Sequence, residues 1–223
     1  MKGMKAMKKF ISIAVGCCLA LSSFVTMAED GSFKDDVSEL ISYGIVSESA
    51  ISMAGTDIVT RGQMVKYAVN AMMMGGIKPT QPTTAFVDVD ETHPAFDAIY
   101  LAYELGIVDG NGDGTFCPDD AVTYEQAAKI LVNMLGYNPM AEQRGGYPNG
   151  YIKVAQQTGI TGGITFVPTD KVLFASGVQL ICKAVQTPVM EQTGYGSEAV
   201  YEVMNGEGGK PLITLAKQFE TNK

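Results

Sequence analysis

The chain has 223 residues, of which 46% are hydrophobic and 18% charged, so it can bury a core and is not disordered throughout. Its 16 basic and 24 acidic residues give a net charge of −8, which argues against nucleic acid as a partner, because phosphate binding requires clustered cations. A single histidine and no tryptophan leave little material for histidine-based metal sites or general-base catalysis. We therefore predict a protein that is not an enzyme and has neither a cofactor nor a metal site.

The first 28 residues have the pattern of a secretory signal peptide. Four lysines lie within residues 1–9, an apolar run follows over residues 10–25, and small residues precede a cleavage point after Ala28. The run is short for a membrane span, so we predict export and no transmembrane segment. Cys17 ends a sequence that loosely resembles a lipoprotein box, which leaves lipidation as an alternative. Removal of the leader leaves 12 basic and 24 acidic residues, which gives the mature protein a net charge of −12.

Three later segments share one pattern, in which a short helical stretch ends in Gly-Ile and a loop leads to an amphipathic helix. The leading residues of these helices are Val59, Val122 and Val172, at spacings of 63 and 50 residues. Because a short helical pair cannot bury its apolar face alone, the three pairs are expected to share one core. The pattern predicts an all-α fold, a pseudo-threefold bundle of three helix-loop-helix repeats.

The start of two of these helices carries a capping signal. Thr60 is followed by Gln63 and Thr123 by Gln126, and each pair has the spacing of a capping box. From the repeats we divide the chain into a signal peptide, three repeats and a C-terminal tail rich in Gly and Glu. The predicted boundaries are 1–28, 29–82, 83–140, 141–190 and 191–223.

The middle segment carries the most specific pattern. It contains Phe86-Val-Asp-Val, Gly106-Ile-Val-Asp-Gly, Gly112-Asp-Gly-Thr-Phe-Cys-Pro118 and Thr123-Tyr-Glu-Gln126. In this order and spacing the motifs resemble a surface-layer homology (SLH) repeat, with its F-x-D-V start, G-I turn, G-x-G-T-F-x-P loop and T-R-A-E-type helix start. The resemblance covers about residues 33–188, in outline only in the first and third segments.

The resemblance implies a function at the cell wall. SLH repeats occur in threes and hold exported proteins on Gram-positive-type walls by binding secondary wall polysaccharides, often with pyruvate ketals. It therefore implies a secreted, non-catalytic module of the cell wall or cell surface, whose partner is a polysaccharide linked to peptidoglycan. A degenerate triad that has lost glycan binding and acts as a structural or protein-interaction module is the alternative.

The resemblance also implies binding residues at the start of each second helix. The family's T-R-A-E arginine contacts the acidic polymer, and Arg61 alone occupies that position. A guanidinium can bond a carboxylate through two N–H groups, and free N–H groups at a helix start would also favour an anion. A solvated arginine on the first turn is the alternative. Aromatic residues at this position in the other segments could stack on a sugar but cannot neutralise a carboxylate. The predicted ligand-binding residues are Thr60, Arg61, Gln63, Thr123, Tyr124, Gln126 and Phe174.

The loop at 109–114, Asp-Gly-Asn-Gly-Asp-Gly, followed by Asp120, matches most of a calcium-binding loop. The next helix starts too late for an EF-hand, and the last ligand is Asp instead of the bidentate Glu. We therefore favour a Gly-rich turn whose Phe116 fills the core. A calcium-dependent, dockerin-like module is the weaker alternative.

The remaining reactive residues have simple structural interpretations. His93 precedes a proline and is interpreted as a helix-entry residue, not as a catalyst. Asp88 and Asp90 could serve a glycosidase, but without a fold signal for one they are interpreted as solvated turn residues. Export would permit a disulfide between Cys117 and Cys182, although Cys182 is equally consistent with a small buried hydrophobe.

Overall fold

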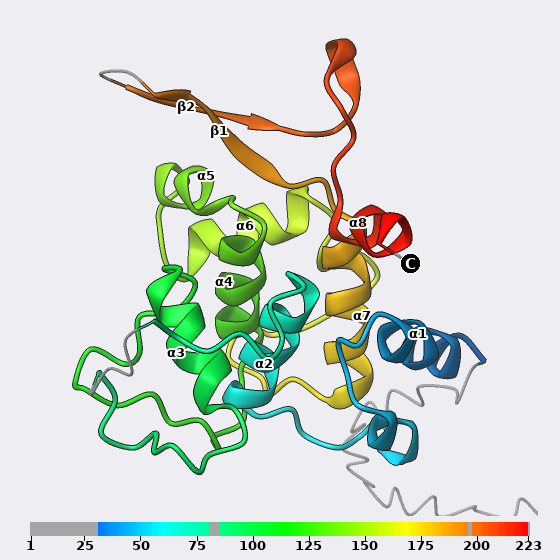
Figure 1. The fold of residues 1–223 in the computed structure, drawn as a ribbon, viewed down its shortest axis with the longest axis vertical. Helices are drawn as coiled ribbons and strands as arrows, with labels where there is room; N and C mark the ends of the chain where they lie inside the picture. The colour runs from blue at the N-terminus through cyan, green and yellow to red at the C-terminus, as the bar shows by residue number, and fades with distance from the viewer. Residues whose placement is uncertain (1–30, 81–84, 196–197, 223) are drawn as a thin grey trace, which may run out of the picture.

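The computed structural model describes residues 31–80, 85–195 and 198–222, which form eight α-helices and one two-stranded sheet (Figure 1). Two short 3-10 helices, Glu48–Ser52 and Glu207–Gly209, lie in loops. The α-helices are α1 (Gly31–Ser42), α2 (Arg61–Ala71), α3 (Phe96–Glu104), α4 (Tyr124–Met134), α5 (Asn138–Gln143), α6 (Asn149–Gln157), α7 (Phe174–Gln186) and α8 (Leu215–Thr221).

The predicted signal peptide, residues 1–28, lies outside the described residues, as does the lipidation alternative at Cys17. Within the described ranges, no helix combines the length and the apolar character that a membrane crossing needs.

The prediction of an all-α, pseudo-threefold bundle is wrong, because the chain continues beyond α7 into a β-hairpin. Strand β1 (Met190–Tyr195) pairs antiparallel with β2 (Ala199–Val203), with an irregularity in register between Gln192 and Gly194. In Figure 1 the hairpin, drawn in orange, extends away from the helical body. Strand β2 reads Ala-Val-Tyr-Glu-Val, and valine and tyrosine favour strands. The described part of the chain is therefore a mixed structure of helices and strands.

A closed set of backbone hydrogen bonds joins the three segments that precede α2, α4 and α7. The N–H of Val59 donates to the carbonyl of Val172 at 3.0 Å, that of Val172 to Val122 at 2.9 Å, and that of Val122 to Val59 at 3.0 Å. All three side chains are buried. We call this set the valine ring. It fixes the starts of the three helices relative to one another and satisfies backbone groups that would otherwise be buried without partners.

The same segments cap one another's helices. At the start of α2, the N–H groups of Arg61 and Gly62 donate to the carbonyls of Asp120 and Pro118, each at 2.8 Å. Equivalent bonds occur at α4 and α7, in the pairs Tyr124–Asp170, Glu125–Pro168, Phe174–Asp57 and Ala175–Gly55. Each helix start is therefore closed by a loop from a different segment of the chain.

The two predicted capping boxes are confirmed. The hydroxyl of Thr60 accepts a hydrogen bond from the N–H of Gln63 at 3.2 Å, and the Gln63 side chain accepts one from the N–H of Thr60 at 2.8 Å. Thr123 and Gln126 form the same reciprocal pair. The start of α7 has no side-chain cap, because Leu173 occupies the corresponding position.

Asp88 lies exposed in a turn, as expected, but its carboxylate also holds a neighbouring loop in place. Its carboxylate accepts hydrogen bonds from the backbone N–H groups of Phe116 and Cys117, at 2.9 and 2.6 Å. Burial alone would raise the pKa of Asp88, but these N–H donors outweigh it, and the pKa lies below its ordinary value of 3.8. The bonds hold the loop so that Phe116 is fully buried, as predicted, against Phe86 at a centroid distance of 5.3 Å.

Gly110 gives this loop its close approach to the core. Its φ is +75°, and a Cβ at this position would lie 2.4 Å from the ring of Phe86. A side chain there would therefore be strained and would also displace an aromatic ring of the core. The glycine that ends the Gly106-Ile-Val-Asp-Gly motif is therefore required for steric reasons.

Replacement of Asp88 should loosen the loop that carries Phe116. We expect Asp88→Asn to lower the free energy of unfolding by about 1 kcal/mol at pH 7, because a charged acceptor for two N–H groups is lost at an exposed position. Urea unfolding measures this change. The exposed neighbour Glu91, changed to Gln, is the matched control and should have little effect.

The effect of Asp88 should depend on pH in one direction. Since its pKa is lowered on folding, its contribution is present above the unfolded-state pKa and is lost as the pH falls through the folded-state pKa, below 3.8. The stability difference between wild type and Asp88→Asn should therefore shrink in strong acid. A difference that stays constant down to pH 2 would contradict this account.

Candidate functional site

Arg61 is the first residue of α2 and is buried, with 9% of its surface exposed. Its guanidinium carbon lies 4.5 Å from the centroid of the Phe116 ring. This distance is typical of a cation–π contact, in which the positive group faces the negative face of the ring. The alternative of a solvated arginine on the first turn is therefore wrong.

The guanidinium of Arg61 makes no direct ion pair in the described part of the chain, although Asp109 and Asp120 lie near enough to attract its charge. The Nε–H of Arg61 has no acceptor among those residues. Burial lowers the pKa of Arg61 below its usual value of 12.5, yet a guanidinium stays protonated in proteins. An unpaired buried charge is destabilising, so its presence favours a binding role over a structural one.

Arg61 lines a cavity of about 320 Å³, which we call the Arg61 pocket. The pocket draws residues from the start of α2, the turn after α3, helix α4 and the loop between α5 and α6. The other lining residues are Ile107, Val108, Asp109, Gly110, Asn111, Gln126, Lys129, Ile130 and Tyr147.

A second cation, Lys129, and one aromatic ring, that of Tyr147, also line the pocket, and Tyr151 lies beside the cation. The ammonium of Lys129 lies 2.6 Å from the carboxylate of Asp109, and 5.6 and 5.8 Å from the ring centroids of Tyr147 and Tyr151. The hydroxyl of Tyr147 donates to Glu125 at 3.2 Å. Burial, together with Glu125, raises the pKa of Tyr147 to about 12, so this phenol remains protonated at neutral pH.

Sequence reasoning missed Lys129 and Tyr147. Lys129 had a signal, because Lys66 occupies the same position in the aligned helix α2. Tyr147 had none, since it lies in a loop of the third segment that has no counterpart motif. Both belong to the pocket only through contacts between residues far apart in sequence.

The predicted polar site residues separate into two groups. Gln126 both lines the Arg61 pocket and belongs to a capping box, whereas Thr60, Gln63 and Thr123 serve the capping boxes and do not line the pocket. The expected free N–H groups at the start of α2 are also not found, because backbone carbonyls and the Thr60 hydroxyl already accept from them. The helix start therefore offers no free N–H group to an anion, and the side chain of Arg61 remains the candidate group.

The structure places the two aromatic candidates in the core. Tyr124 is 8% exposed and stacks on Phe166 at a centroid distance of 4.7 Å. Phe174 is 0% exposed and meets Phe33 edge-on at 5.9 Å. Their rings have little or no surface to offer a sugar, and neither lines the Arg61 pocket.

The calcium-loop side chains are used within the protein. Asp109 pairs with Lys129, and the Asp113 carboxylate accepts from the N–H and hydroxyl of Thr115 at 2.9 and 2.6 Å. Asn111 donates to the same hydroxyl at 3.0 Å. The Asp109 and Asp113 carboxylates thus already have partners, Lys129 of α4 and Thr115 of the loop, which supports the Gly-rich turn.

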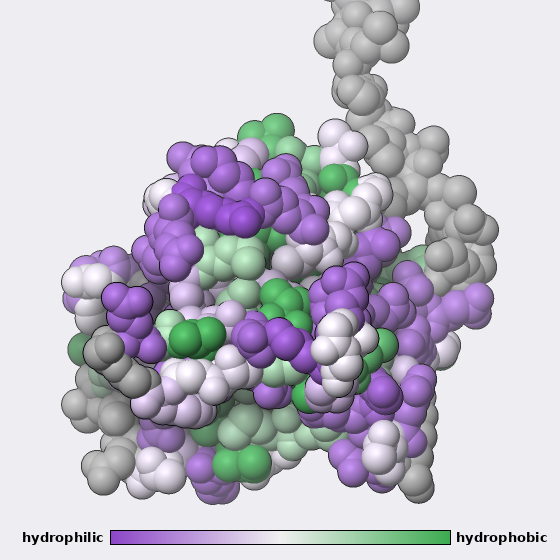
Figure 2. Space-filling model, turned by 90° about the horizontal axis from the view of Figure 1, so that it is seen from above, coloured by the Kyte–Doolittle hydropathy of each residue, from purple (hydrophilic) through white to green (hydrophobic). Residues whose placement is uncertain are grey.

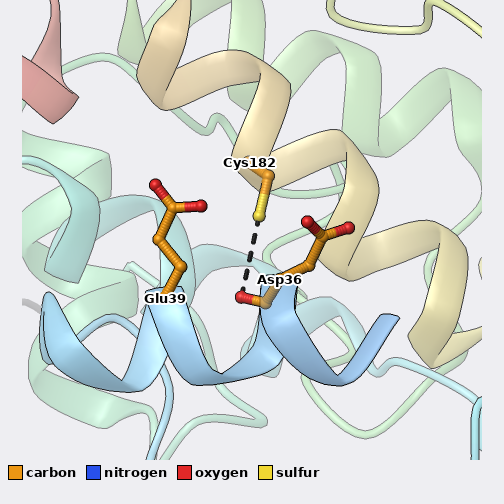
Figure 3. A group of neighbouring side chains, drawn as sticks. All are labelled: Asp36, Glu39 and Cys182. Atoms are coloured by element: carbon orange, nitrogen blue, oxygen red, sulfur yellow. Dashed lines mark hydrogen bonds between the residues drawn. The ribbon is translucent and has the colours of Figure 1, made fainter. Parts of the chain in front are cut away.

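A separate cluster joins α1 to α7 (Figure 3). Its members are Asp36 and Glu39 of α1 and Cys182 of α7, whose ligand atoms lie within 4.8 Å of one another. The Cys182 thiol donates to the carbonyl of Asp36 at 3.9 Å, and burial raises its pKa to about 12. Since metals bind the thiolate, this thiol is a poor ligand. Cys117 and Cys182 are both free, so the disulfide alternative is not found.

The face of the molecule drawn in Figure 2 has no single large apolar area. Figure 2 shows hydrophobic residues in small patches separated by hydrophilic ones. Such scattered exposure is ordinary for a folded protein and indicates no docking site by itself.

Comparison with known proteins agrees with the motifs. The family model described as S-layer homology domain matches residues 85–128. A cell surface protein of Thermoanaerobacter kivui is 27% identical over 92% of this chain and 25% of its own length. A surface layer protein of Brevibacillus choshinensis is 28% identical over 87% of this chain and 18% of its own length. An endoglucanase of a Bacillus species is 32% identical over 42% of this chain and 9% of its own length.

The chain thus spans a quarter or less of the length of these relatives. The matched family region contains Asp88, the Gly110 turn and Phe116, the residues that build the loop under Arg61. Motifs and relatives agree: residues 85–128 match the S-layer homology domain, and most of the chain is similar to part of a cell surface protein and of a surface layer protein.

Proposed function

We propose that the Arg61 pocket binds an acidic polysaccharide of the cell wall and that this contact anchors the protein without catalysis. The observation that carries the proposal is the buried guanidinium of Arg61, which lines a pocket and has no acceptor for its Nε–H in the described chain. The proposed partner is a secondary polysaccharide linked to peptidoglycan, and a pyruvate ketal is one source of its carboxylate.

The pocket has the groups that such a ligand requires. A carboxylate can accept two parallel hydrogen bonds from Arg61, and a buried setting strengthens such charge-assisted bonds. The half-exposed ring of Tyr147 offers an apolar face to a sugar, and Gln126 adds a polar side chain. From the predicted ligand set we retain Arg61 and Gln126 and assign Thr60, Gln63 and Thr123 to capping. The predicted repeat boundaries remain part of the proposal.

Catalysis is not part of the proposal. A glycosidase of the common type needs two carboxylates that flank the bond to be cleaved. The Arg61 pocket is lined by one carboxylate, that of Asp109, which forms an ion pair with Lys129. The endoglucanase relative shares only 9% of its length with this chain, which supports a common accessory module.

A degenerate module that no longer binds glycan is the second candidate. The observation that favours it is the burial of Tyr124 and Phe174 at positions equivalent to Arg61. Co-sedimentation with purified cell-wall sacculi separates the two candidates. Binding only when the sacculi carry their secondary polymer supports the first, and absence of binding in either form supports the second.

Removal of the Arg61 charge should weaken binding strongly without unfolding the protein. We expect Arg61→Met to weaken co-sedimentation by about 1.5–3 kcal/mol, the range for a hydrogen bond to a charged group. Its melting temperature should be unchanged or higher, because methionine keeps apolar volume over Phe116 and removes an unpaired buried charge. Arg144→Met, which changes the only other arginine, is the matched control. Equal binding by wild type and Arg61→Met would contradict the proposal.

The protein should bind one ligand per chain. Tyr124 and Phe174 fill the positions equivalent to Arg61 with buried rings, so those positions supply no cation. Titration calorimetry with a soluble fragment of the wall polymer should give a stoichiometry of one. Phe174→Ala should lower stability by about 3–5 kcal/mol, as expected for a truncated core aromatic, and should leave the number of sites unchanged. A stoichiometry of two or three would overturn the single-site account.

A further inference from the structure

We propose that Asp109, paired with Lys129, limits the Arg61 pocket to ligands that bring one negative charge, and thus to sugars with a single carboxylate. This inference rests on the proposed function and adds the charge class of the ligand. It assigns a selective role to a residue that the sequence suggested only as part of a calcium loop.

The pocket is lined by a carboxylate and an ammonium group that come from two different parts of the chain. Asp109 follows the Gly-Ile turn after α3, and Lys129 lies in α4, with their charged atoms 2.6 Å apart. The Asp109 side chain is 68% exposed, whereas that of Lys129 is 26% exposed. The acid therefore lies on the solvent side of the pair and meets an incoming anion before the ammonium does.

The net charge of the pocket lining sets how much negative charge on a ligand the pocket can neutralise. Arg61 and Lys129 contribute two positive charges and Asp109 one negative charge, so the lining has a net charge of one positive. The nearby carboxylate of Glu125, bonded to Tyr147, does not line the pocket. One ligand carboxylate matches this lining, while a second negative charge would be repelled by Asp109.

Lys129 can serve both Asp109 and a ligand. Its ammonium has three donors, and Asp109 is the one acceptor found for it within the described chain, so donors remain for a sugar hydroxyl. The rings of Tyr147 and Tyr151 hold the ammonium on its other side. The expected ligand therefore presents a carboxylate to Arg61 and a hydroxyl oxygen to Lys129.

Charge variants of the full chain test this assignment. The probes are sacculi that carry their secondary polymer, a disaccharide with one glucuronic acid, and an oligomer of glycerol phosphate. We expect Asp109→Asn to bind the first two about three- to tenfold more tightly, since a like charge near the ligand is removed. It should also gain binding to the glycerol phosphate oligomer. Asp170→Asn, an exposed change of equal charge away from the pocket, should behave as wild type.

Lys129 variants separate charge selection from simple hydrogen bonding. Lys129→Met should bind less tightly than wild type, because Asp109 then repels the ligand without compensation. The double variant Asp109→Asn/Lys129→Met should recover part of that loss. Melting temperatures close to wild type would show that these changes leave the fold intact. The gain at Asp109→Asn should decrease as salt is added, because screening weakens the repulsion.

The outcomes distinguish this inference from the proposed function. If wild type binds, Arg61→Met does not, and Asp109→Asn binds more weakly or equally, the charge-selection role is overturned while the proposed function stands. A wild type that binds the glycerol phosphate oligomer as well as the glucuronide would also overturn it. If wild type binds neither sacculi nor the glucuronide, the proposed function fails, and this inference fails with it.

Discussion

The valine ring is the constraint on which the site depends. The backbones of Val59, Val122 and Val172 are hydrogen-bonded to one another. The segments that lead into helices α2, α4 and α7 therefore lie side by side. The loop before each helix then lies against the start of another one and closes it. Arg61 consequently lies over Phe116, a residue 55 positions away in the sequence. The Arg61 pocket therefore exists only when the three segments are assembled.

One backbone arrangement holds three different sets of side chains. At the start of α2 a cation covers a buried ring, at α4 Tyr124 stacks on Phe166, and at α7 a phenylalanine is fully buried. The two aromatic positions contribute packing, while Arg61 carries charge at a cost in stability. A chain with a net charge of −8 repels an anionic polymer at long range, so the proposed binding requires a local site such as this one.

The sequence predicted features that depend on nearby residues and missed those that depend on distant contacts. The capping box at Thr60 could be predicted because its partner Gln63 is three residues away in the sequence. Phe116 was correctly assigned to the core from its loop motif. The hairpin was missed because two short strands in a Gly-rich tail give a weak pattern. The burial of Arg61 and the pair of Asp109 with Lys129 follow from long-range packing, which spacing alone does not reveal.

The most direct test of the central claim is to observe the Arg61 Nε–H during binding. The chain contains two arginines, Arg61 and Arg144, so a nitrogen-15 NMR spectrum of arginine side chains is simple to assign with one substitution. On addition of a soluble, carboxylate-bearing wall fragment, the Arg61 signal should shift and become protected from exchange, because its Nε–H gains an acceptor. The Arg144 signal should not change. A fragment that binds while the Arg61 signal stays in place would contradict the account.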